Sequence, residues 1–248
     1  MRSSFLPISN GSAFIKALKR KPENFFIIHY SCQSLNDENE GLSPRITSVA
    51  ISHFATEQSV SFSTHSVAEE LHIPRGNVLA RFDEVESILL QQFYSFVRDR
   101  RGAFWVHWNM RNATYGFEHL EHRYRVLGRT DASIVPVEQR INLNDMLSDR
   151  FGSDYAAHQK LPNLMDMNGG RHRDFLSGTE EVNAFASGEF LKMHKSTLCK
   201  VSFFHLVMRL LISGRLKTSS RGFGARLDKA LESRAANRLL KKCALDLV

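Results

Sequence analysis

Apolar and polar positions along the first part of the chain alternate in a way that predicts three short strands. Residues 24–31 form a compact apolar run, and residues 45–54 and 58–64 place apolar and polar side chains alternately. Such a period of two is typical of a strand with one buried face. The loop at residues 55–57 is so short that the second and third strands should pair as an antiparallel hairpin.

Helical spacing of apolar side chains begins at residue 83. Asp83 is predicted to cap a helix over residues 83–98, with Glu86 completing a capping box. A short apolar run at residues 104–108 predicts a fourth strand. The other predicted elements are a very short strand at 141–143 and helices at 12–20, 117–128, 144–150, 179–190, 198–213 and 225–247. Residues 35–44, 65–82 and 161–170 are predicted to be loops or irregular structure, because they combine polar residues with glycine or proline.

This pattern divides the chain into three parts. Residues 1–23 are predicted to be a solvated N-terminal arm, residues 24–214 an α/β domain, and residues 215–248 a basic C-terminal helical extension. The extension has leucines on one side and basic side chains on the other. Three roles are open to it: docking on the domain, forming a homo-oligomer, and binding a polyanion.

Composition narrows the class of protein. Hydrophobic residues make up 42% of the chain, which is enough for a sizeable core and excludes a largely disordered protein. No apolar run approaches the roughly 18 residues of a membrane span, and residues 1–21 lack the order of a signal peptide. We therefore expect a cytoplasmic protein with no membrane partner. Cys32, Cys199 and Cys243 are far apart and odd in number, which argues against a disulfide framework and a zinc site.

Tryptophan, histidine and arginine side chains are concentrated between residues 104 and 125. This stretch holds both tryptophans, three of the eleven histidines and three arginines. It passes from a predicted strand into a predicted helix, and strand ends in α/β proteins open into the crevices where ligands bind. Trp105 and Trp108 should point to opposite faces of the strand, one into the core and one toward the crevice.

The charge of the chain indicates what such a crevice would bind. The net charge is +7 and the isoelectric point is about 9.5, and polyanions are the natural partners of a basic surface. Nucleic acid is therefore the predicted partner. The predicted contacts are polar and aromatic side chains at the strand ends and basic side chains nearby or in the extension: His29, Ser31, Trp108, Asn109, Arg111, Tyr115, Arg123, Arg238, Lys241 and Lys242.

The order of the predicted elements resembles that of the ribonuclease H-like fold, and more specifically of the DEDD 3'-5' exonuclease superfamily. That superfamily carries an Asp-x-Glu on its first strand, a second aspartate at the helix after the fourth strand, and a third near the last helix. The matching places here are His29-Tyr30-Ser31, Trp108-Asn109 with Tyr115-Gly116, and Glu180-Glu181. The resemblance covers residues 24–212 and implies a mixed β-sheet of ribonuclease H-like order with flanking helices.

The matching places differ from the superfamily in their chemistry. His29, Ser31 and Gly116 stand where the superfamily has carboxylates. Two divalent metals need several convergent carboxylates, so two-metal hydrolysis is expected to be absent and no metal ligand is assigned. Mg²⁺ or Mn²⁺ would be a cofactor only if the fold were active. Acidic side chains near the first strand remain candidates for displaced ligands: Asp37, Glu38 and Glu40.

Three functions are compatible with this sequence. The leading hypothesis is a nucleic-acid-binding protein on a degenerate exonuclease-like scaffold, a pseudoenzyme. The second is an active nuclease, a toxin or defence effector, using His107, Arg111, His119 and His122; histidine transfers protons near neutral pH, and arginine holds phosphate. The third is a regulatory subunit whose crevice binds a partner protein.

Overall fold

A single five-stranded mixed sheet organises the computed structural model, which describes residues 8–34 and 43–219. The strand order is β3-β2-β1-β4-β5. β1 pairs antiparallel with β2 and parallel with β4; β2 and β3 form an antiparallel hairpin, and β4 and β5 are parallel. The strands are β1 (Phe25–Cys32), β2 (Ile46–His53), β3 (Ser59–Ser63), β4 (Phe104–His107) and β5 (Arg140–Asn142).

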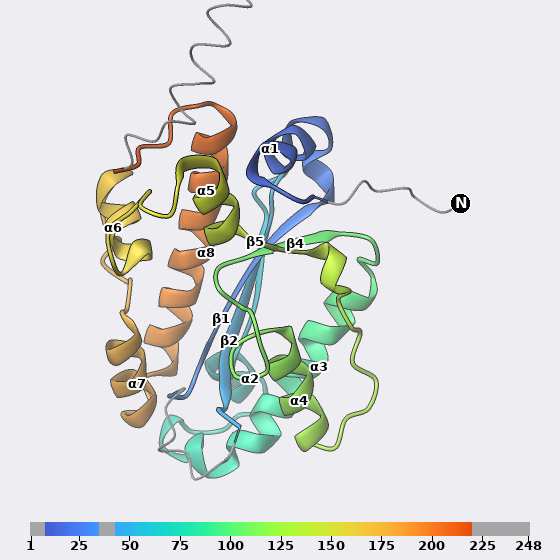
Figure 1. Cartoon of the computed structure of the whole chain (residues 1–248). Coiled ribbons are helices and arrows are strands. Elements are labelled where there is room, and N and C mark those ends of the chain that lie inside the picture. The colour runs from blue at the N-terminus through green and yellow to red at the C-terminus, as the bar shows by residue number, and fades with distance from the viewer. Residues whose placement is uncertain (1–7, 35–42, 220–248) are drawn as a thin grey trace, which may run out of the picture.

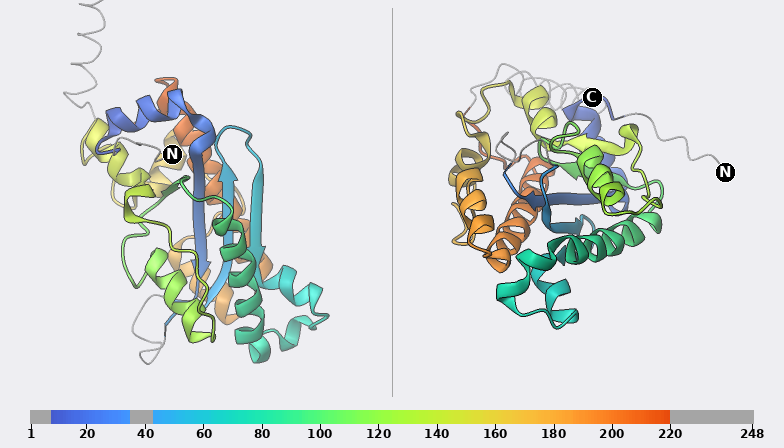
Figure 2. Two further views of the ribbon diagram at one scale, coloured as in Figure 1. Left: turned by 90° about the vertical axis from the view of Figure 1, so that its right-hand side faces the viewer. Right: turned by 90° about the horizontal axis from the view of Figure 1, so that it is seen from below.

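Helices cover both faces of this sheet, so the molecule has three layers (Figure 1). The long helix α8 (Phe190–Ile212) crosses one face, while α3 (Phe82–Arg98) lies on the other with α4 (Phe117–Val126); Figure 2 shows the sheet between them. The remaining helices are α1 (Gly11–Arg20), α2 (Thr64–Glu70), α5 (Leu143–Phe151), α6 (Lys160–Met167) and α7 (Gly178–Ala186). None of the helices in the described part of the chain is long and apolar enough to cross a membrane.

Alternate side chains of β1 pack into two apolar clusters, one on each face of the sheet. Ile27 packs into the apolar cluster under α8, while Ile28 and Tyr30 pack into the cluster that includes the buried side of α3. His29 and Ser31 follow Ile27 with the same parity, so their side chains project toward α8. The strand is therefore buried on both faces, and its polar residues must find partners inside the protein.

Two of the segments predicted to be irregular contain helices. Residues 65–82 include most of α2, and residues 161–170 include most of α6. Pro162 lies in the first turn of α6, where a backbone N–H has no partner within the helix, so proline is tolerated there. α8 begins at Phe190 and not at residue 198, because its first turns bury polar residues that obscure the apolar periodicity.

The start of α3 differs from the predicted capping box. Arg81 occupies the N-cap position and Asp83 lies inside the first turn. Glu86 is fully buried; its carboxylate accepts hydrogen bonds from Arg123 of α4 and from the Ile46 N–H at 2.7 Å. A tertiary ion pair therefore takes the place of the local cap.

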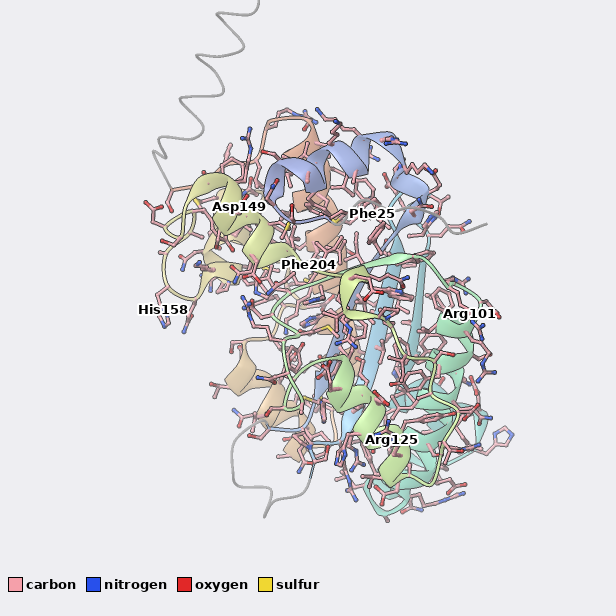
Figure 3. The ribbon with its side chains drawn as sticks, turned by 45° about the vertical axis from the view of Figure 1, so that its right-hand side comes forward. Phe25, Arg101, Arg125, Asp149, His158 and Phe204 are labelled. Carbon is pink, nitrogen blue, oxygen red and sulfur yellow. The ribbon has the colours of Figure 1, made fainter. Side chains whose placement is uncertain are left out.

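The prediction that residues 1–23 form a solvated arm is wrong for α1. Phe14 and Leu18 are buried in the cluster under α8, and the Gly11 N–H donates to the Asp149 carboxylate of α5 at 2.9 Å (Asp149 is labelled in Figure 3). α1 is thus part of the packed domain. The predicted helix at residues 225–247 lies outside the described residues, as do the candidate contacts Arg238, Lys241 and Lys242.

Candidate functional site

The C-terminal end of β1 carries a buried polar cluster. The Ser31 hydroxyl donates to Oε1 of Glu181 in α7 at 3.0 Å. It also lies 2.8 Å from the Thr197 hydroxyl of α8, which in turn lies 2.6 Å from the Ser48 hydroxyl of β2. The three hydroxyl groups are almost wholly removed from water. The cluster joins β1, β2, α7 and α8 by hydrogen bonds.

Lys200 provides the positive charge of this cluster. Its ammonium donates to Oε1 of Glu181 at 2.6 Å, and the Ser196 hydroxyl donates to the same oxygen at 3.0 Å. Both charged side chains are mostly buried. A buried carboxylate needs such a partner, because an unpaired charge is strongly disfavoured away from water.

His29 lies next to this cluster as a neutral base. Burial, the positive charge of Lys200 and the neighbouring His107 hold the pKa of His29 well below its ordinary value. The Tyr115 hydroxyl donates to the Tyr30 carbonyl at 3.0 Å and lies 3.3 Å from Nδ1 of His29. Since the hydroxyl has one proton and the carbonyl must accept it, Nδ1 of His29 carries a proton and donates to the Tyr115 oxygen.

His107, at the end of β4, is also neutral. Burial and the charge of Arg140 lower the pKa of His107 to about 4. Nδ1 accepts the Met110 N–H at 3.2 Å, which fixes the proton on Nε2. The imidazole therefore helps to hold the turn that follows the strand.

That turn is built around Asn109, whose positive φ of 56° is the left-handed conformation that asparagine tolerates better than most residues. Its side-chain oxygen accepts from Asn144 at 3.0 Å and from Asn142 at 3.3 Å, while its backbone N–H donates to Asn142 at 3.1 Å. Tyr155 donates to Asn144 at 2.5 Å. The ends of β4 and β5 are thereby tied together by side-chain amides.

Arg111 lies at the outer side of this amide network. Its guanidinium makes two hydrogen bonds to the Asp145 carboxylate, at 2.8 and 2.5 Å, and a third to the Asn109 side chain at 3.1 Å. Arg111 and Asp145 are each nearly half exposed. The Asp145 carboxylate thus holds the arginine in a fixed orientation at the surface.

The three carboxylates beside these strand ends each have a basic partner: Glu181 pairs with Lys200, Asp145 with Arg111, and Glu118 with Arg140. Among the residues that the structure describes, no three histidine, cysteine, aspartate or glutamate side chains converge as a metal site. These side chains do not fit a pair of divalent cations, which requires converging carboxylates free of other counter-ions. Asp37, Glu38 and Glu40 lie outside the described residues.

Gly116, which stands where the exonuclease superfamily has its second aspartate, has no room for a side chain. A Cβ atom there would lie 2.5 Å from the Asn112 carbonyl oxygen and 2.9 Å from its nitrogen. The Gly116 N–H donates to the Tyr30 hydroxyl at 2.9 Å. An aspartate at this position would force the loop before α4 to move.

The histidines and arginines of α4 do not gather with His107 and Arg111. The Tyr30 hydroxyl, which receives the Gly116 N–H, lies 2.9 Å from Nδ1 of His119, and Nε2 of His119 lies 2.9 Å from the Pro44 carbonyl. His119 is therefore a buried neutral link, and burial lowers its pKa to about 4. His122 is exposed, and Arg123 is buried against Glu86.

The two tryptophans point to opposite faces, as predicted. Trp105 stacks on Phe26 in the cluster that contains α3, and Trp108 stacks on Phe204 of α8 with ring centroids 5.5 Å apart. Phe204, in the middle of the molecule (Figure 3), also contacts the ring of His29. Trp108 thus lies beside the site, but both indoles are buried and neither offers a free stacking face.

Sequence reasoning missed Lys200, Thr197, Asn144 and Asp145. A signal was present for Lys200, since a lysine between Cys199 and Val201 interrupts an apolar helix and requires a buried partner. The other three have no local signature, because their role depends on residues brought to them by distant elements.

Comparison of the chain with models of protein families, with curated proteins and with solved structures found no match.

Proposed function

We propose that this protein binds nucleic acid on a degenerate exonuclease-like scaffold and does not hydrolyse it by a two-metal mechanism. The observation that carries the proposal is the pairing of each acidic side chain at the ends of β1 and β4 with its own basic side chain. Ion pairs of this kind remove the negative charge that would attract divalent cations.

The strand order supports the scaffold part of the proposal. A β3-β2-β1-β4-β5 sheet, in which β1 is antiparallel to β2 and parallel to β4, places the ends of β1 and β4 side by side. This mixed sheet is compatible with the order of strands and helices along the chain on which the resemblance to the ribonuclease H-like fold rests. His29 and Ser31 occupy the end of β1 in place of carboxylates, and Gly116 leaves no room for one.

Arg111 is the group best placed to hold a phosphate. Its planar guanidinium makes a two-pronged contact with Asp145, and phosphate oxygens match the same geometry. Asp145 acts as a placeholder that orients the arginine until a phosphodiester takes over one or both hydrogen bonds. The overall charge of +7 adds long-range attraction for a polyanion.

A matched set of variants tests this proposal. Arg111→Ala should weaken binding of a fluorescein-labelled single-stranded RNA or DNA by about tenfold or more, the usual effect of losing a charged hydrogen bond. Asp145→Asn should strengthen binding, because it removes the competing negative charge and keeps an oxygen for the hydrogen bond from Asn142. Arg171→Ala is the control, since Arg171 makes a similar exposed two-pronged contact with Asp166 on α6.

Fluorescence anisotropy at several salt concentrations measures these affinities. The affinity of the unaltered protein should fall steeply as salt rises, because bound phosphates release counterions. Equal effects of Arg111→Ala and Arg171→Ala would contradict the assignment of the site. Cleavage of either probe with Mn²⁺ would contradict the non-hydrolytic scaffold and favour the nuclease alternative. Absence of binding at low salt would favour a protein partner.

A further inference from the structure

A groove lies at the opposite edge of the sheet from the candidate site. It has a volume of about 780 Å³ and is formed where α3 ends, where β4 begins, and by the loop that leads from α4 to β5. Since β1 and β4 are parallel, their starts and their polar ends lie at opposite edges of the sheet. The groove is large enough for a bound segment of ligand, and the proposed nucleic-acid function does not use it.

Three arginines give this groove its charge. Arg98 is paired with Asp131 at 2.8 Å, which leaves the positive charges of Arg100 and Arg101 without an ion pair among the described residues. Figure 3 shows Arg101 at the periphery of the molecule, on the side away from α6 and His158. The groove therefore has an excess of positive charge and fits an anionic ligand.

Arg100 is held in position by aromatic side chains. Its guanidinium lies 3.4 Å from the centre of the Phe96 ring, and one of its N–H groups donates to the Phe96 carbonyl at 2.8 Å. A guanidinium stacked in this way has little freedom left to lose on binding. The arrangement is suited to a planar carboxylate or a phosphate.

Apolar side chains beside the arginines indicate which of these two anions, a carboxylate or a phosphate, the groove would bind. Of the six large apolar side chains that are exposed in the described part of the chain, three lie between residues 126 and 137: Val126, Ile134 and Val137. Ile134 lines the groove and is 63% exposed. Val137 follows the lining residue Pro136 and is 72% exposed. A phosphodiester backbone gains little from aliphatic contacts, whereas a peptide can bury apolar side chains against them.

The backbone of the loop also favours a peptide. Residues 131–135 have no regular secondary structure, and their N–H groups donate to no other described residue. An extended peptide laid along this loop can pair with such groups as an added strand does at a sheet edge.

We propose that this groove binds an extended acidic segment of a partner protein, with carboxylates on Arg100 and Arg101 and an apolar side chain against Ile134 and Val137. This binding site is independent of the proposed nucleic-acid site. It would let the protein hold a protein partner and a nucleic acid at opposite edges of the same sheet.

Titration of the ¹⁵N-labelled protein, followed by NMR, tests the proposal with a peptide of alternating glutamate and leucine. The amide signals of Arg100–Gly102 and of residues 131–135 should shift. Arg101→Glu should weaken binding about tenfold or more through loss of the charged contact. Val137→Ser should weaken it about fivefold through loss of apolar contact. Lys16→Glu, an equal charge change at an exposed position on α1, should have no effect.

Four outcomes would overturn the proposal. The first three are an absence of shifts, shifts confined to other parts of the surface, and equal binding of a peptide of alternating lysine and leucine. The fourth is single-stranded RNA shifting the same signals with an affinity that depends on Arg101 but not on Val137, which would make the groove a polyanion site. Arg111→Ala should leave peptide binding unchanged, so failure at one site is distinguishable from failure at the other.

Discussion

The ammonium of Lys200 lies 2.6 Å from Oε1 of Glu181, where α8 and α7 meet the end of β1. Lys200 therefore provides, from within the protein, the positive charge that this carboxylate needs. Ser31 and Ser196 complete the hydrogen bonding of the same oxygen. An internal cation that is covalently part of the protein leaves little electrostatic advantage for a metal ion at this position.

Removing the Lys200 ammonium should destabilise the protein. Lys200→Met leaves Glu181 buried without a counter-ion, and the free energy of unfolding should fall by about 3–5 kcal/mol. Adding Glu181→Gln should recover most of this loss, because the remaining amide carries no charge. Urea denaturation measures both values, with Lys192→Met as control: Lys192 pairs with Glu189 at the surface, where such a pair contributes about 0–1 kcal/mol. A loss for Lys200→Met no larger than that of the control would contradict this account.

Stability should depend on pH through the buried histidines. The pKa of His119 is lowered to about 4 by burial, whereas the unfolded chain has the ordinary value near 6.5. Between these values the unfolded state binds a proton that the folded state does not. Stability should therefore fall as pH falls from 6.5 to 4, by on the order of 3 kcal/mol for His119, with His107 and His194 acting in the same direction.

Substitution separates the contribution of His119. His119→Gln should be less stable than the unaltered protein at neutral pH, because the link between Tyr30 and Pro44 is disturbed, but its stability should vary less with pH. His122→Gln, which changes an exposed histidine on the same helix, is the matched control. Thermal unfolding at pH 7 and pH 5 provides the comparison; an equal pH dependence in all three proteins would rule out His119 as a contributor.

Gly11 tests the docking of α1 on α5. A Cβ atom at Gly11 would lie 2.6 Å from the Met146 carbonyl oxygen and 3.0 Å from Cβ of Arg150. Gly11→Ala should therefore destabilise the protein by about 1–3 kcal/mol through overpacking. Gly76→Ala is the control, because a Cβ there meets nothing within 4 Å. A Gly11→Ala variant as stable as the control would mean that α1 does not pack closely against α5.

The sequence alone was enough to predict the secondary structure near its strongest periodic signals. Alternating side chains located β2 and β3 and their hairpin, and helical spacing located α3 and α4. The sequence also located a polar segment, residues 29–31, at the end of a buried strand. These features depend on residues that are close together in the sequence, so the pattern of apolar and polar residues is enough to predict them.

Local patterns failed where packing overrides periodicity. α2 and α6 were missed because each is short and lies in a segment marked by proline, glycine or polar residues. The first turns of α8 were missed because buried Ser196 and Thr197 look like surface residues until their partners are known.

The tertiary structure alone decided which polar residues are free and which are paired. Ser31 meets Glu181 across 150 residues of chain, and Arg111 meets Asp145 across 34. No spacing rule links residues so far apart, since their approach depends on the strand order and on the path of each connection. The sequence thus determined which chemical groups lie at the strand ends, and the fold determined that these groups neutralise one another.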